Sequence, residues 1–308
     1  MKHYLLLAEF MSTPWAMQDD RLAAFTALVS RWSAGVRLSE IEIEAAIGAD
    51  KQARDTRRDA TARAGGGGIA VLPLYGAVTQ RGNMAGNVSG SGGVSTQQFA
   101  QALRAAVADD TVGQILIDID SPGGSVYGVG ELAAEIFDAR SKKPVVGIAN
   151  SCAASAAYWL GAQCSQLYCT PGGEVGSIGV KMVHEDVSKA LEADGISPTI
   201  ISAGKFKSEG SPYGPLSDES KAFLQSRVED YYGAFTKAVA KGRGAAIAQV
   251  RDGYGQGRCI GADAALAEGM IDGIATFDDV VAKMTRNAKA ARSASRVAQA
   301  KNTLAMMQ

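Results

Sequence analysis

The hydrophobic residues between positions 69 and 274 follow two alternating patterns. Short runs rich in β-branched residues, most clearly Gln114–Asp120 (Gln-Ile-Leu-Ile-Asp-Ile-Asp), are typical of buried strands. Between them lie segments of about 10–15 residues in which apolar positions recur with helical spacing. Strands that alternate with helices predict an α/β layered fold, in which helices cover a sheet.

The same pattern predicts the bounds of the individual elements. Strands are expected at residues 69–74, 114–120, 144–149, 167–169, 176–183 and 197–202. Helices are expected at residues 95–108, 126–140, 184–194, 217–242 and 261–269, with one more among the small residues after position 150. Ser95–Gln98 has the Ser-x-x-Gln form of a capping box, which marks the start of the first of these helices.

Three regions follow one another along the chain. Residues 1–64 are expected to form a helical, charge-mixed N-terminal region and linker, with a flexible joint predicted at Gly65–Gly68. Residues 65–274 are expected to form the compact domain, with a mobile glycine-rich loop predicted at 82–94. Residues 275–308 form a basic tail, whose six Lys and Arg residues have no acidic residue among them. Such a tail is either a solvated end or a docking arm for an acidic partner.

Composition and charge exclude several classes of function. A formal net charge of −1 gives no reason to expect a nucleic-acid partner. The four cysteines form no Cys-x-x-Cys pair and no cluster with histidine, so we expect free thiols in a reducing compartment, with no metal and no cofactor. Residues 144–173 are uncharged, but polar residues interrupt them, so no membrane span is expected. With no secretory signal evident, the sequence predicts a cytoplasmic protein.

Two motifs supply the parts of a hydrolytic site. Ser121–Gly124 (Ser-Pro-Gly-Gly) follows a predicted strand, and its glycines allow a sharp turn that presents bare N–H groups to a ligand. Ser155 lies among alanines near the start of a helix, where the N–H of Ala156 is a candidate donor to an oxyanion. Ser151 is the other serine of this run and equally suits a helix N-cap.

The base that would activate this serine is a lysine rather than a histidine. The chain has only two histidines, and His184 has no acidic partner obviously placed for it. A lysine can act as a base when desolvation lowers its pKa. Lys205 and Lys207 lie in the same extended segment, so their spacing cannot separate them, and Lys181 is a weaker candidate.

Together these residues resemble the serine–lysine peptidases of the signal-peptide peptidase A family. The likeness is closer to the phage branch, the prohead (capsid-maturation) proteases of the lambda minor capsid protein C type, and it runs from about Ile69 to Ile274. The motifs that carry it are Asp118–Gly124, Asn150–Tyr158, Gly176–Val180 and Gly204–Tyr213.

The resemblance implies a fold and a role for each site residue. The fold would be the Clp/crotonase-like α/β fold of stacked β-β-α units. Ser155 would be the nucleophile and Lys207 the general base, since Lys207 aligns with the family lysine. Ser177 would orient that lysine, and Gly124 would donate to the oxyanion. Family members assemble into rings in which each subunit supplies part of its neighbour's site, so a homo-oligomer is expected.

The function implied is a serine endopeptidase that cleaves phage scaffold and head proteins in the host cytoplasm or prohead. Compared with the family, we expect neither the membrane anchor of the cellular members nor the long C-terminal scaffold region of the lambda type. Three alternatives stay open: a cytosolic protease of membrane-derived or misfolded peptides, a catalytically silent head protein, and a crotonase-type acyl-thioester enzyme.

Overall fold

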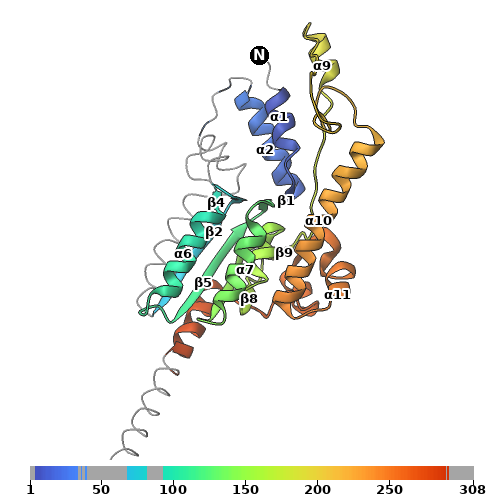
Figure 1. Ribbon diagram of the computed structural model, residues 1–308. Coiled ribbons are helices and arrows are strands. Elements are labelled where there is room, and N and C mark those ends of the chain that lie inside the picture. The colour runs from blue at the N-terminus through green and yellow to red at the C-terminus, as the bar shows by residue number, and fades with distance from the viewer. Residues whose placement is uncertain are drawn as a thin grey trace, which may run out of the picture.

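The computed structural model of the protein describes residues 4–33, 36, 39, 68–81, 93–288 and 290 (Figure 1). The flexible joint expected at Gly65–Gly68 and the loop expected at 82–94 lie largely outside these residues. The first element expected after the joint, the strand at 69–74, is present as β2 (Ile69–Tyr75).

The central sheet consists of the β-branched runs that the sequence marks as strands. Within the described residues its main path has the order β10-β9-β7-β5-β2, and β8 pairs with β7 and β11. The other bounds are β5 (Gln114–Ser121), β7 (Val145–Ala154), β8 (Gln166–Cys169), β9 (Glu174–Gly176), β10 (Cys259–Gly261) and β11 (Gly273–Ile274). Strands β2, β5, β7 and β9 are parallel neighbours, so their carboxyl ends meet at one edge.

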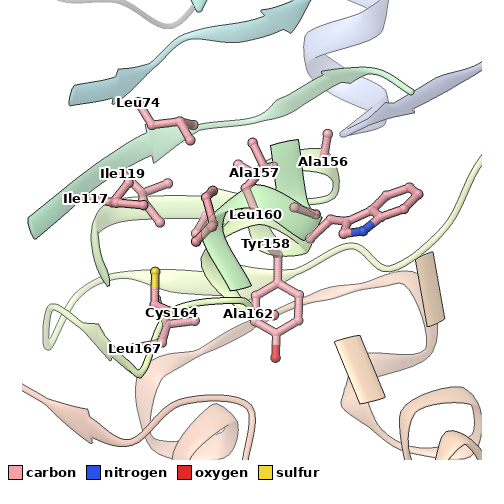
Figure 2. Packing of buried hydrophobic residues seen from close by; sticks show 14 of the residues in the cluster. Leu74, Ile117, Ile119, Ala156, Ala157, Tyr158, Leu160, Ala162, Cys164 and Leu167 are labelled. Carbon is pink, nitrogen blue, oxygen red and sulfur yellow. The ribbon is translucent and has the colours of Figure 1, made fainter. Parts of the chain in front are cut away.

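Both faces of this sheet are buried, which explains why its strands carry apolar residues on both faces. On β5, the side chains of Ile115, Ile117 and Ile119 belong to the main core, whereas Leu116 belongs to a second cluster on the opposite face. Figure 2 shows the main core where Ala157 and Leu160 lie close to Ile117 and Ile119.

The second face is covered by residues 277–288, which are helical. Their Val280 and Met284 are buried against Leu116 and Tyr168. The region expected to be a basic tail therefore begins as a helix that docks on the sheet, because its apolar residues recur with helical spacing.

The remaining helices cover the main core. They are α6 (Thr96–Ala108), α7 (Val129–Ala139), α8 (Ala156–Gly161), α10 (Asp218–Arg243), α11 (Ile247–Asp252) and α12 (Ala262–Ala267). Ser95 caps α6 as expected, since its Oγ accepts a hydrogen bond of 3.3 Å from Gln98 N. Helices on both faces of a mainly parallel sheet form the α/β fold of the Clp/crotonase type that was expected.

A small second sheet lies at the edge where the strands of the central sheet end. Within the described residues its order is β1-β6-β3-β4, with β1 (Trp15–Met17), β6 (Gly123–Ser125), β3 (Ala77–Thr79) and β4 (Gly93–Ser95). The N-terminal helices α1 (Tyr4–Met11) and α2 (Asp19–Ser33) flank β1. The helical N-terminal region is therefore interrupted by a strand that the hydrophobic pattern does not predict.

An arm extends from the body, formed by residues 184–217 and the beginning of α10 (Figure 1). It carries the short helix α9 (Ser188–Ala193). The strand expected at 197–202 is wrong, because these residues are exposed and have no neighbouring strand among the described residues. The strand expected at 176–183 is wrong beyond its first residue: β9 lies earlier in the chain and ends at Gly176, and from 177 to 183 only Lys181 forms a bridge, to Trp15.

Candidate active site

Ser155 occupies a sharp turn between β7 and α8. Its backbone has φ 54° and ψ −116°, a conformation that non-glycine residues rarely adopt and that is often found at functional sites. Its N–H donates a hydrogen bond of 2.7 Å to Gly176 O at the end of β9. The alanines on either side, Ala154 and Ala156, are fully buried. The backbone therefore holds Ser155 in place, with no room for larger neighbours.

The hydroxyl of Ser155 is buried and, among the described residues, makes no hydrogen bond. A buried polar group without a partner costs about 1–3 kcal/mol, so in a native structure it calls for an explanation. A nucleophile that waits for a base and a substrate would leave its hydroxyl in this state, which is the role that the sequence predicts for Ser155.

The Ser-Pro-Gly-Gly turn lies directly beside Ser155. Gly123 has φ 96°, and a Cβ at this position would lie 3.0 Å from Ser155 Cβ and 2.2 Å from Ala16 O. A Cβ on Gly124 would lie 1.9 Å from Val78 O, so neither glycine has space for a side chain. The sequence pointed to Gly124 as the oxyanion donor but not to the place of Gly123 beside Ser155; the double glycine was the available signal.

Ala156 is the first residue of α8, where a helix leaves its N–H without an intrahelical partner. This position makes the N–H available as a second donor beside Ser155. The helix has only six residues. Its contribution is therefore the position of one N–H group rather than the dipole of a long helix.

Ser177 lies close to Ser155 because their strands are neighbours. Gly176 pairs with Ala154 across β9 and β7, so Ser177 and Ser155 each leave the sheet at the same edge. Ser177 has φ 55° and its N–H donates to Arg258 O at 2.8 Å. It also lines a cavity of about 440 Å³, together with Trp15 and Lys181.

Lys207 lies elsewhere, in the exposed turn of the arm. Within the described part of the chain, no hydrogen bond joins it to Ser155. Its neighbour Lys205 forms an ion pair with Glu219 at 3.1 Å and lies over the ring of Phe206. One chain therefore brings together Ser155, Gly124, Ala156 and Ser177, but not Lys207.

The other candidates have different surroundings. Lys181 forms an ion pair with Asp19, and burial lowers the pKa of the Lys181 ammonium below its usual value. His184 Nε2 lies 3.1 Å from Gly214 O at the base of the arm. Ser151 lies within β7, so its interpretation as a helix N-cap is wrong, and Ser155 holds that position instead.

Within the described residues, no helix is both long and apolar enough to span a bilayer, and no three metal-binding side chains come together. All four cysteines are free, and two of them, Cys152 and Cys259, are only partly buried.

Comparison with known proteins identifies relatives of this chain. The model of peptidase family S49 matches residues 138–291, half of the chain. Capsid assembly protease C of Escherichia phage lambda is 36% identical over 60% of this chain and 42% of its own length. Head-tail preconnector protein GP5 of Enterobacteria phage P21 is 34% identical over 58% of this chain and 36% of its own length. The putative protease MJ0651 of Methanocaldococcus jannaschii is 33% identical over 57% of this chain and 56% of its own length.

The chain thus spans less than two thirds of each of these relatives. The region matched by the family model includes Ser155, Ser177 and Lys207, and Gly124 lies just before it. These matches confirm the resemblance that the motifs indicate, and the chain belongs to peptidase family S49.

Proposed function

We propose that this chain is a serine endopeptidase that cleaves scaffold or head proteins during prohead maturation. The names of two relatives, a capsid assembly protease and a head-tail preconnector protein, support the substrate class. The place of action would be the host cytoplasm or the prohead. One observation supports this chemistry most directly. The buried hydroxyl of Ser155 has no hydrogen-bond partner in the described structure, and Ser155 lies beside Gly123.

In the proposed reaction, Ser155 Oγ attacks the carbonyl carbon of the scissile bond while Lys207 Nζ takes its proton. The N–H groups of Gly124 and Ala156 donate to the oxyanion that forms, and loss of one such donor costs roughly 3–4 kcal/mol in the barrier. Lys207 then protonates the leaving amine as the C–N bond breaks. Water hydrolyses the remaining ester and restores Ser155. Ser177 is proposed to hold Lys207 in position.

A second copy of the chain is proposed to supply Lys207. A lysine acts as a base only when it is uncharged, so it has to be desolvated. In the single chain the arm is solvent-exposed, and so are its large apolar residues, which are Ile196, Ile200, Ile201 and Phe206. Apolar surface of this kind is typical of an interface. Docking of the arm on a neighbour would bury these residues and Lys207 together, within a ring.

Co-expression with the neighbouring head or scaffold gene product tests this proposal. The wild-type chain is expected to cleave that protein, and Ser155→Ala and Lys207→Ala are expected to leave it intact on a gel. Lys205→Ala is the matched control, because Lys205 is paired with Glu219 and should be dispensable. Full activity of Lys207→Ala would rule out this lysine as the base.

A cytosolic protease of the same chemistry, acting on membrane-derived or misfolded peptides, is the second candidate. The similarity to MJ0651, a putative protease whose organism is not a phage, favours it. Gene neighbourhood separates the two functions, since adjacent portal and capsid genes favour the phage role.

A further inference from the structure

The strand β1 runs through the candidate site between two other segments. On one side, Trp15–Met17 pairs antiparallel with Gly123–Ser125 of β6. On the other side, Trp15 and Lys181 exchange two main-chain hydrogen bonds of 2.9 and 3.0 Å. An extended peptide that binds to a sheet needs a free strand edge. Here β1 already occupies the edge of β6 that adjoins Ser155.

The register of β1 places the carbonyl of Ala16 opposite Gly124, whose N–H is the proposed oxyanion donor. Pro14 and Gln18, two residues to either side of Ala16, form hydrogen bonds of 3.2 and 3.1 Å with the segment Pro122–Val126. Hydrogen-bonded pairs recur every second residue in an antiparallel ladder. Ala16 and Gly124 lie opposite each other midway between these bonds, so they form such a pair, with Gly124 N–H donating to Ala16 O.

The same carbonyl borders the nucleophile. Ala16 O and Ser155 Cβ lie 2.2 and 3.0 Å from the point that a Cβ on Gly123 would occupy. Both atoms therefore adjoin the one small space left open by the missing side chain of Gly123.

The rest of β1 is held by burial and by side-chain hydrogen bonds on either side of it. Ala16 is fully buried, and Trp15 and Met17 are each 4% exposed. Trp15 Nε1 donates to Phe10 O at 3.0 Å, and Gln18 Nε2 donates to Glu174 Oε1 at 3.0 Å. The strand thus has contacts at both ends and a small side chain at the residue beside Ser155.

We propose that β1 is a substrate strand bound within its own chain, and that the Ala16–Met17 peptide bond is the first bond this enzyme cuts. Removal of residues 1–16 would free the edge of β6 for an extended peptide with a small residue in the position of Ala16. The inference rests on the proposed function, since it requires Ser155 as the nucleophile and Lys207 of a neighbouring copy as the base.

The proposed cut between Ala16 and Met17 is an ordinary peptide-bond hydrolysis. Ser155 Oγ bonds to the carbonyl carbon of Ala16, and its proton passes to Lys207. The bond from that carbon to Met17 N breaks, and Lys207 returns the proton to the new amine. Water then hydrolyses the Ser155 ester, which leaves a carboxylate on Ala16 and an amino terminus on Met17.

Intact-mass measurement of the purified full-length chain tests the inference. The wild-type chain is expected to lose residues 1–16 and to begin at Met17, whereas Ser155→Ala is expected to keep them. Ala16→Phe should block the cut, because the site has no space for a larger side chain at residue 16. Ala27→Phe, on an exposed position of α2, is the matched control and should be cut like the wild type.

A second measurement covers the case in which Ala16→Phe fails to fold. Labelling of Ser155 by a fluorophosphonate probe should be weak while residues 1–16 are attached and strong after the cut. Cleavage of the head protein by a wild-type chain that keeps residues 1–16 would overturn this inference and leave the proposed function standing. A cut at another bond, or one that persists in Ser155→Ala, would also overturn it.

Discussion

Gly123 and Ser155 are the two residues whose backbones bring the site together. Both have positive φ, 96° and 54°, and both follow the end of a strand in the central sheet. A side chain on Gly123 would fill the space where Ser155 and the Ala16 carbonyl meet. At the residue scale, the site therefore depends on the absence of one methyl group.

Gly123→Ala is expected to abolish most activity while the protein still folds. The added Cβ must displace Ala16 O or Ser155, and a displacement of about 1 Å at a reacting group can cost 100-fold in rate. The left-handed backbone adds a strain of roughly 1–2 kcal/mol. Thermal unfolding and cleavage assays would measure the two effects. Gly172→Ala is the control, because nothing lies within 4 Å of its Cβ.

Among the secondary-structure elements, helix α10 connects the arm to the body that contains the sheet. Its Phe235 ring stacks on Trp159 of α8 at 4.6 Å, next to the strand-to-helix turn that carries Ser155. At its C-terminal end, Arg243 forms two hydrogen bonds with Asp272, of 2.7 and 3.0 Å, and its side chain is only 7% exposed. These contacts fix α10, whose beginning belongs to the arm, against the body of the molecule.

Asp272→Asn is expected to lower the free energy of unfolding at pH 7 by about 3 kcal/mol, because it leaves the buried Arg243 without its partner charge. Burial alone would raise the pKa of Asp272, but hydrogen bonds from Arg243 and Leu167 bring it below the usual value. The stabilisation is therefore present above the unfolded pKa of about 3.9 and is lost as the pH falls through the lower folded pKa.

Denaturant unfolding of wild type and Asp272→Asn between pH 7 and pH 3 measures this difference. The gap between the two proteins should narrow toward acid pH. Asp110→Asn, at an exposed position, is the matched control for the substitution itself. A gap for Asp272→Asn that stays constant across the range would contradict the assignment.

At the scale of the whole molecule, the two proposed catalytic residues lie apart within one chain. Ser155 is buried at the end of the sheet, and Lys207 is exposed in the segment 184–217 that forms the arm. Subunits that contribute different surfaces to each interface close into rings. An active site shared between neighbours follows from this arrangement if the chain assembles as proposed.

Mixing two inactive variants tests the shared site. Rings assembled from equal amounts of Ser155→Ala and Lys207→Ala chains should recover about a quarter of the wild-type activity, because that share of interfaces joins an intact serine to an intact lysine. Each variant alone should be inactive. If the mixture is also inactive although mixed rings form, serine and lysine act within one chain.

The sequence alone was sufficient for the α/β fold and for most element positions, because buried strands and helices leave regular hydrophobic periods. It also pointed to peptidase family S49 through local motifs around Ser121–Gly124 and Ser155, where small residues and turns are needed. Each of these motifs is a continuous stretch of the chain, so the sequence alone is enough to recognise it. The strand predicted at 197–202 is wrong because β-propensity is a local property: within the described residues, no strand lies beside this segment to pair with it.

Only the tertiary structure revealed the contacts between distant segments. Strand β1 has no periodicity of its own, since its three residues are all buried, and it is a strand because β6 and Lys181 pair with it. The proximity of Gly123 to Ser155 likewise depends on two strand ends that meet across the sheet. Such pairings arise from the register of neighbouring strands, and no local stretch of sequence contains that information.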